Sequence, residues 1–106
     1  MPTWTVTSPL SYHYIKFSVS PPCTDALLLR KSLQDALDQS FGLVSANTYV
    51  DVLWVSEEGS ETVVRIAHRE AAKLMAATTV YQGPRKLSVL KESPFLPTLS
   101  SVQITL

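Results

Sequence analysis

The feature that most constrains the fold of this chain is the order in which strand-like and helix-like segments follow one another. Residues 12–20 (YHYIKFSVS) alternate between apolar and polar side chains, the period of two that is typical of a half-buried strand. The next apolar side chains recur every four positions through 27–41, behind Thr24 or Asp25 as the N-cap and in front of Gly42 as the C-terminal cap. We therefore predict a strand followed by an amphipathic helix.

The rest of the chain continues this pattern and places a hairpin in its middle. Residues 47–55 and 61–67 are rich in β-branched and aromatic side chains and enclose a polar turn that contains a glycine. A second helix is predicted from about residue 69 to 82, ended by a Gly-Pro pair, and a fourth strand over 85–91. The order β-α-β-β-α-β predicts an α+β, ferredoxin-like fold, a four-stranded antiparallel sheet with two helices on one face. The expected spatial order of the strands is 4-1-3-2.

The length of the chain predicts a single domain over residues 1–106. A chain of 106 residues supports one hydrophobic core, which we place in residues 12–92 with a short extension at each end. Both extensions alternate in polarity, at 4–7 and at 102–106, and each is predicted to form a short additional strand. No apolar run approaches the roughly 18 residues that a membrane span needs, so no membrane association is expected.

The period of two also assigns each strand residue to one face of the sheet. The side chains expected to pack under the helices are Ile15, Phe17, Val19, Val52, Trp54, Val64, Ile66, Leu87 and Val89. The opposite face then carries Tyr12, Tyr14, Tyr49, Leu53, Val55, Val63 and Leu90.

This opposite face is predicted to be too apolar to remain in contact with water. Contiguous exposed apolar patches larger than about 400 Å² usually mark a partner surface. We therefore expect the face to be covered, either by another protein or by the end segments of the chain itself. The candidate protein-interface residues are Tyr12, Tyr14, Tyr49, Leu53, Val63, Val102 and Ile104.

Charge is distributed unevenly along a chain whose net charge is zero. Residues 1–61 carry a net charge of −4, whereas residues 62–91 carry a net charge of +5. Proteins that bind nucleic acid on their own are usually basic overall, so any RNA contact of this chain is expected to be local. The candidate RNA-contact residues are Arg69, Lys73, Arg85 and Lys86. A solvated helix face is the alternative interpretation of the first two.

Residues that carry catalysis, metals or cofactors are sparse in this sequence. The single cysteine, Cys23, has only two histidines as further soft ligands, which argues against a closed zinc site. The three glycines lie too far apart to form a phosphate-binding loop. The acidic residues Glu57, Glu58 and Glu61 cluster in the hairpin turn, where a solvated loop is more common than a cation site. We predict no catalytic, cofactor-binding or metal-binding residue.

The predicted order of elements also occurs in RNA-recognition motifs. In those domains the third strand carries aromatic residues that stack on bases. The third predicted strand here, 61–67, contains neither Phe nor Tyr, so base stacking would depend on Tyr12, Tyr14 and Tyr49. The sequence therefore disfavours this mode of RNA binding.

Four segments of the chain resemble a known family. YHYIKFSVS, LQDALDQSFGLVSA, TVVRIAHREAAKLMAAT and LSVLKES are similar to segments of small protein subunits of nuclear ribonuclease P and ribonuclease MRP, of the fungal Pop8 type related to Rpp14. The most telling pieces are Phe41-Gly42 after the first helix, Arg65 in the third strand and the ending Leu-Lys-Glu-Ser of the fourth strand. The similarity runs from about residue 12 to 96. Sister subunits end the fourth strand with a segment like Ser-Gly-Thr-Ile, and Ser93-Pro94-Phe95 departs from it.

The resemblance implies a non-catalytic subunit of a nuclear and nucleolar ribonucleoprotein. In that family the RNA cleaves the phosphodiester bond, and the proteins brace the RNA and one another for 5′ processing of precursor tRNA and processing of precursor rRNA. The resemblance also implies pairing with a paralogous ferredoxin-like subunit, contact with an Rpp1-like subunit, and indirect or limited contact with RNase P/MRP RNA. The alternative, from another class, is a ferredoxin-like homodimeric regulatory domain that binds a small ligand.

Overall fold

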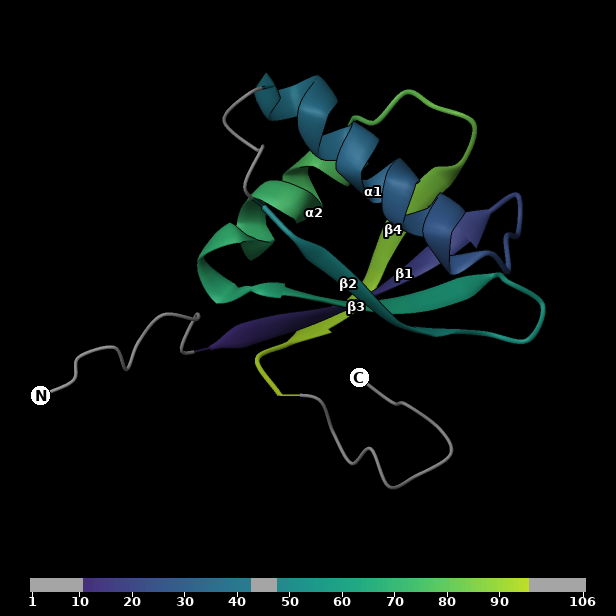
Figure 1. Cartoon of the computed structure of the whole chain (residues 1–106), viewed down its shortest axis with the longest axis horizontal. Coiled ribbons are helices and arrows are strands. Elements are labelled where there is room, and N and C mark those ends of the chain that lie inside the picture. The colour runs from purple at the N-terminus through teal and green to yellow at the C-terminus, as the bar shows by residue number, and fades with distance from the viewer. Residues whose placement is uncertain (1–10, 43–47, 96–106) are drawn as a thin grey trace, which may run out of the picture.

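The computed structural model describes residues 11–42 and 48–95. The elements follow the predicted order, with one short 3-10 helix added before the second α-helix (Figure 1). They are β1 (Tyr12–Ser20), α1 (Ala26–Phe41), β2 (Val50–Val55), β3 (Glu61–Ala67), η3 (His68–Glu70), α2 (Ala71–Thr79) and β4 (Lys86–Ser93). The predicted additional strands at 4–7 and 102–106 lie outside the described residues.

The four strands form one antiparallel sheet in the order β2-β3-β1-β4. This order places β1 and β3 in the centre and β2 and β4 at the edges, and it confirms the predicted ferredoxin-like topology. Both helices cover the same face of the sheet, and we call the other one the open face (Figure 1). No helix within the described ranges is long and apolar enough to cross a membrane.

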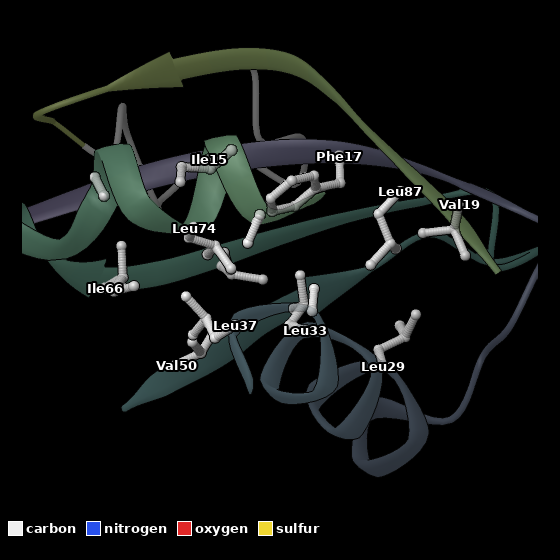
Figure 2. Close-up of a cluster of buried hydrophobic side chains, with 14 of the residues drawn as sticks. Ile15, Phe17, Val19, Leu29, Leu33, Leu37, Val50, Ile66, Leu74 and Leu87 are labelled. Carbon is white, nitrogen blue, oxygen red and sulfur yellow. The ribbon is translucent and has the colours of Figure 1, made fainter. Parts of the chain in front are cut away.

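The hydrophobic core lies between the helices and the covered face of the sheet (Figure 2). Ile15 and Phe17 project from β1 toward the helices and have no exposed surface. α1 contributes leucines at every fourth position, because that spacing keeps side chains on one side of a helix. The labelled core side chains are Ile15, Phe17, Val19, Leu29, Leu33, Leu37, Val50, Ile66, Leu74 and Leu87.

The ends of α1 are fixed by local capping. The Asp25 carboxylate accepts hydrogen bonds from the backbone N–H groups of Leu27 (2.9 Å) and Leu28 (3.4 Å), which otherwise lack partners inside the helix. At the other end Gly42 has a φ of 58°, and its N–H donates to the carbonyl of Asp38. Of the two N-cap residues that the sequence allowed, Asp25 is therefore the one used.

The second helix is shorter than the sequence predicts, because α2 ends at Thr79 rather than near residue 82. The hydroxyl groups of Thr78 and Thr79 both donate to the backbone carbonyl of Met75, in competition with the helical ladder. Just beyond, the side-chain amide of Gln39 on α1 both donates to and accepts from the backbone of Gln82. Gln82 is thus held by a side chain instead of by a further helical turn.

A β-bulge in β2 changes the predicted assignment of its side chains. The pairing with β3 shifts between Val52 and Trp54, so that Trp54 lies opposite Val63 on the open face. Val55 then lies opposite Thr62 and packs against the core. An inserted residue shifts every later side chain to the other face, which is why the predicted inward Trp54 and outward Val55 are both wrong.

A second irregularity affects β4, whose pairing with β1 shifts between Lys16 and Phe17. Val89 lies opposite Phe17, on the helix side as predicted, yet 38% of its surface is exposed because β4 is an edge strand. Leu90 follows at the shift itself and is also exposed. Val89 is therefore not the core residue that the alternation predicts.

Candidate interaction surfaces

The open face is built around Arg65 in the middle of β3. Its Nη2 lies 2.7 Å and its Nε 3.2 Å from the same carboxylate oxygen of Asp51 on β2. On the other side, the guanidinium carbon lies 4.5 Å from the centre of the Tyr12 ring on β1. The hydrogen bonds to Asp51 raise the pKa of Arg65 above its ordinary value. A polar contact thus runs across three strands where the sequence predicted an apolar face.

The neighbouring positions of the open face are also occupied by charge. Lys16 on β1 lies 3.3 Å from the carboxylate of Glu61 on β3. Val63 sits between the cross-strand positions of Lys16 and Trp54 and has no exposed surface. The expectation of a broad apolar patch on this face is therefore wrong, and Val63, one of the candidate interface residues, is not accessible from solvent.

The tyrosines that the sequence grouped together are separated in the structure. Tyr12 and Tyr14 lie half-buried on the open face, and Tyr12 already carries the Arg65 guanidinium. Tyr49, in contrast, lies under Arg30 of α1, with the guanidinium carbon 4.3 Å from its ring centre. The predicted grouping of Tyr49 with the other two is wrong, because the ring turns toward the helix at the edge of the sheet.

The edge of the sheet next to α1 holds a groove of about 190 Å³. Its lining residues are Ala26, Leu27, Arg30, Tyr49, Val50, Asp51 and Val52. Leu27 and Tyr49 are among the most exposed large apolar residues of the described chain, and Leu53 at the bulge is exposed as well. The interface candidates Val102 and Ile104 lie outside the described residues.

The four candidate RNA-contact residues form two separate pairs. Arg69 lies in η3, just before α2, and Lys73 lies in the first turn of α2, whereas Arg85 and Lys86 follow the end of α2 across a short loop. Because α2 has nine residues, the two pairs lie at opposite ends of a helix about 13 Å long. The structure therefore does not bring the four cations together into one basic patch.

The first pair shares one carboxylate. Lys73 Nζ lies 2.9 Å from Glu70 Oε1, and Arg69 Nε lies 3.6 Å from Glu70 Oε2. The hydrogen bond from Lys73 lowers the pKa of Glu70 below its ordinary value. The Arg69 side chain is nevertheless largely exposed, so it carries the cation of this pair that is most available to a partner.

The second pair lines a hollow of about 650 Å³ between the end of α2 and the beginning of β4. Arg85 Nη1 donates to the hydroxyl of Ser32 on α1 at 3.1 Å, which connects the residue just before β4 to the first helix. Its Nε is buried and has no hydrogen-bond partner in the described part of the chain. Lys86 is exposed beside it.

Two histidines meet although they are far apart in sequence. His13 Nε2 and the Glu92 carboxylate are 2.6 Å apart, and the His13 and His68 ring centres are 5.2 Å apart. These contacts depend on the pairing of β1 with β3 and with β4, so no pattern within one segment of the sequence indicates them. Over 11–42 and 48–95, no group of three or more His, Cys, Asp or Glu residues is placed to hold a metal ion.

Comparison with known proteins adds two findings. The family model described as "Ribonucleases P/MRP protein subunit Pop8" matches residues 11–81, from β1 to just beyond α2. A chain in a cryo-EM structure of yeast ribonuclease MRP shares the fold, with a TM-score of 0.70 and 20% sequence identity over 92% of this chain and 83% of that chain. No match was found among the curated proteins.

Proposed function

Because this chain belongs to the Pop8 family of ribonuclease P/MRP protein subunits, we propose that it acts in that ribonucleoprotein as a non-catalytic scaffold. The observation that carries the proposal is the family match, which spans three of the four strands and both helices. In this role the RNA component performs the cleavage, and the protein braces the RNA and its sibling subunits. The proposed activity of the particle is 5′ processing of precursor tRNA and processing of precursor rRNA.

The proposed protein partners are a paralogous ferredoxin-like subunit and an Rpp1-like subunit. Exposed apolar side chains support a protein partner, because isolated surfaces of this kind gain stability when a second protein covers them. Among the described candidates these side chains are Tyr49 and Leu53 at the β2 edge, with Tyr12 and Tyr14 half-buried on the open face. Val102 and Ile104 remain candidates from the sequence.

We further propose that contact with the RNA is limited. Arg69 and Lys73 already share Glu70, and Arg85 is tied to Ser32, so these cations have protein partners of their own. Phosphate contacts add affinity in proportion to the cations that make them, and two small pairs therefore contribute little to a large assembly. The proposed location of the particle is the nucleus and nucleolus.

The experiment that tests this function is purification of a tagged full-length chain from its own cells. We expect the RNase P or RNase MRP RNA and sibling protein subunits to co-purify, as measured by quantitative reverse transcription and mass spectrometry. The tag alone serves as the control. A chain that purifies as a homodimer with a bound small molecule and without either RNA would overturn the proposal in favour of the regulatory-domain alternative.

The RNA contacts are tested separately in the same purification. Charge reversal at Arg69 and Lys73 is compared with charge reversal at Arg85 and Lys86. Each double variant should lower RNA recovery only slightly at physiological salt and leave sibling proteins bound. Complete loss of RNA from either variant, with protein pairing intact, would contradict the limited contact that we propose.

A further inference from the structure

The two edges of the sheet differ in how well they are protected against strand addition. β4 presents Lys86, Lys91 and Glu92, and edge lysines are a common means of preventing another strand from pairing there. β2 (VDVLWV) carries one charge, Asp51, and that carboxylate is already bound by Arg65. Within the described ranges, β2 pairs only with β3, so its other side is an open backbone edge.

The open edge of β2 lies beside a groove of suitable size for one side chain. The groove of about 190 Å³ lies between β2 and the beginning of α1, and Ala26, Leu27 and Val52 contribute apolar surface to it. An added strand points every second side chain toward the helices, which is the direction in which this groove lies. One large apolar side chain of an added strand would therefore fill it.

A cation stands at this groove without an ionic partner. Arg30 lies over the Tyr49 ring, and it forms no ion pair within the described ranges. A carboxylate on an added strand would supply the ion-pair partner that Arg30 lacks in the described part of the chain. A second copy of β2 supplies no free carboxylate, because Asp51 of each copy is held by its own Arg65.

We propose that the open edge of β2 binds an extended segment of a sibling protein subunit by strand addition. Backbone hydrogen bonds to β2 supply affinity. A large apolar side chain in the groove and a carboxylate at Arg30 supply specificity. Only the choice of a sibling subunit as the partner depends on the proposed function. The edge, the groove and the unpaired cation are properties of this chain alone.

The first test is hydrogen–deuterium exchange of the full chain, alone and in the purified particle. Strand addition should slow exchange of backbone amides within 50–55 by at least tenfold in the particle. Amides of β4, residues 86–93, provide the internal comparison for the other edge. Protection that appears in β4 but not in β2 would overturn the proposal.

The second test uses matched variants of the full chain. Leu53→Lys places a charge on the β2 edge, and Leu90→Lys does the same at the β4 side, where the leucine is similarly exposed (38% and 46%). Arg30→Glu reverses the groove cation, and Lys31→Glu reverses an adjacent exposed cation of α1. Leu53→Lys and Arg30→Glu should each lower recovery of the sibling protein at least fivefold, and the two controls should leave it unchanged.

The possible failures are distinguishable. Absence of both RNAs from the wild-type purification would overturn the proposed function, whereas normal assembly of all four variants would overturn only the strand addition. A dimer of the isolated chain that Leu53→Lys dissociates, seen by analytical ultracentrifugation, would identify a second copy as the occupant and contradict our choice. If Leu53→Lys fails to fold by circular dichroism, Arg30→Glu and the exchange of the wild-type chain decide.

Discussion

The two faces of the sheet are stabilised in different ways. The covered face packs Ile15, Phe17 and Val64 against leucines of both helices, and these side chains have no exposed surface. The open face instead joins β1, β3 and β2 through the contacts of Arg65 with Tyr12 and Asp51. Apolar burial contributes far more stability than partly exposed ion pairs. Most of the free energy of folding therefore comes from the covered face, and substitutions on the open face should cost less stability.

The largest expected effect is that of truncating Phe17, a core residue on the covered face. Phe17→Ala should lower the free energy of unfolding by about 3–5 kcal/mol, because the truncation leaves a cavity that close-packed neighbours fill only in part. Phe17 lies in the middle of β1, with no exposed surface. Urea denaturation followed by circular dichroism measures the loss. A change below about 1 kcal/mol would show that the core tolerates collapse at this position.

The corresponding change on the open face should be smaller. Trp54→Ala is expected to cost about 1–2 kcal/mol, because the indole is only partly buried and its removal leaves no closed cavity. The same denaturation experiment compares it directly with Phe17→Ala. A loss equal to that of Phe17→Ala would contradict the bulge and return Trp54 to the core.

The bulge explains which parts of the structure the sequence could predict. The period of two and the period of four locate β1, α1 and β3 and their buried sides, because those elements are regular along their whole length. The same counting fails after Val52, since an inserted residue leaves no trace in a pattern of apolar residues. The prediction of an apolar open face failed for another reason: ion pairs of Lys16 and Arg65 lie on that face, and Val63 is buried.

The sequence predicts which residue types belong to the candidate surfaces, but it does not predict which of these residues contact one another. Arg65 is one of the residues that carry the family resemblance, but its contact with Asp51 depends on the register of β2 against β3. The contacts of Arg30 with Tyr49 and of Ser32 with Arg85 join α1 to the residues just before β2 and just before β4. Such contacts are set by the packing of α1 on the sheet, which a single sequence does not specify.

A smaller effect is expected from the ion pair on the open face. Asp51→Asn should reduce stability by less than about 1 kcal/mol, because both side chains are partly exposed and water screens their interaction. The neutral amide still accepts a hydrogen bond from Arg65, which limits the loss further. Thermal denaturation at low and high salt checks this. Asp35→Asn is the control, because Asp35 forms a more exposed ion pair with Lys31 on α1. A loss comparable to that of Phe17→Ala would mean that the open face stabilises the fold as much as the core.

The smallest expected effect concerns Glu70 in η3, because the hydrogen bond from Lys73 lowers the pKa of this carboxyl group. A carboxylate with a lowered pKa in the folded state adds stability above its unfolded pKa, and this contribution is lost as pH falls through the folded pKa. Glu70→Gln should therefore be less stable than the wild type by a few tenths of a kcal/mol near neutral pH. The difference should shrink as the solution becomes more acidic than the ordinary glutamate pKa of about 4.5.

Urea denaturation at several pH values measures this difference. Glu57→Gln is the matched control, because Glu57 is exposed in the hairpin turn and makes no ion pair within the described residues. Lys73→Met should remove most of the effect of Glu70→Gln, since Lys73 is the main cause of the lowered pKa. A difference that grows toward acid pH would have the wrong sign for a carboxylate stabilised in its charged form. In that case Glu70 would be stabilised as the neutral acid. Its contribution to stability would then come from burial, as it does for the side chains of the covered face.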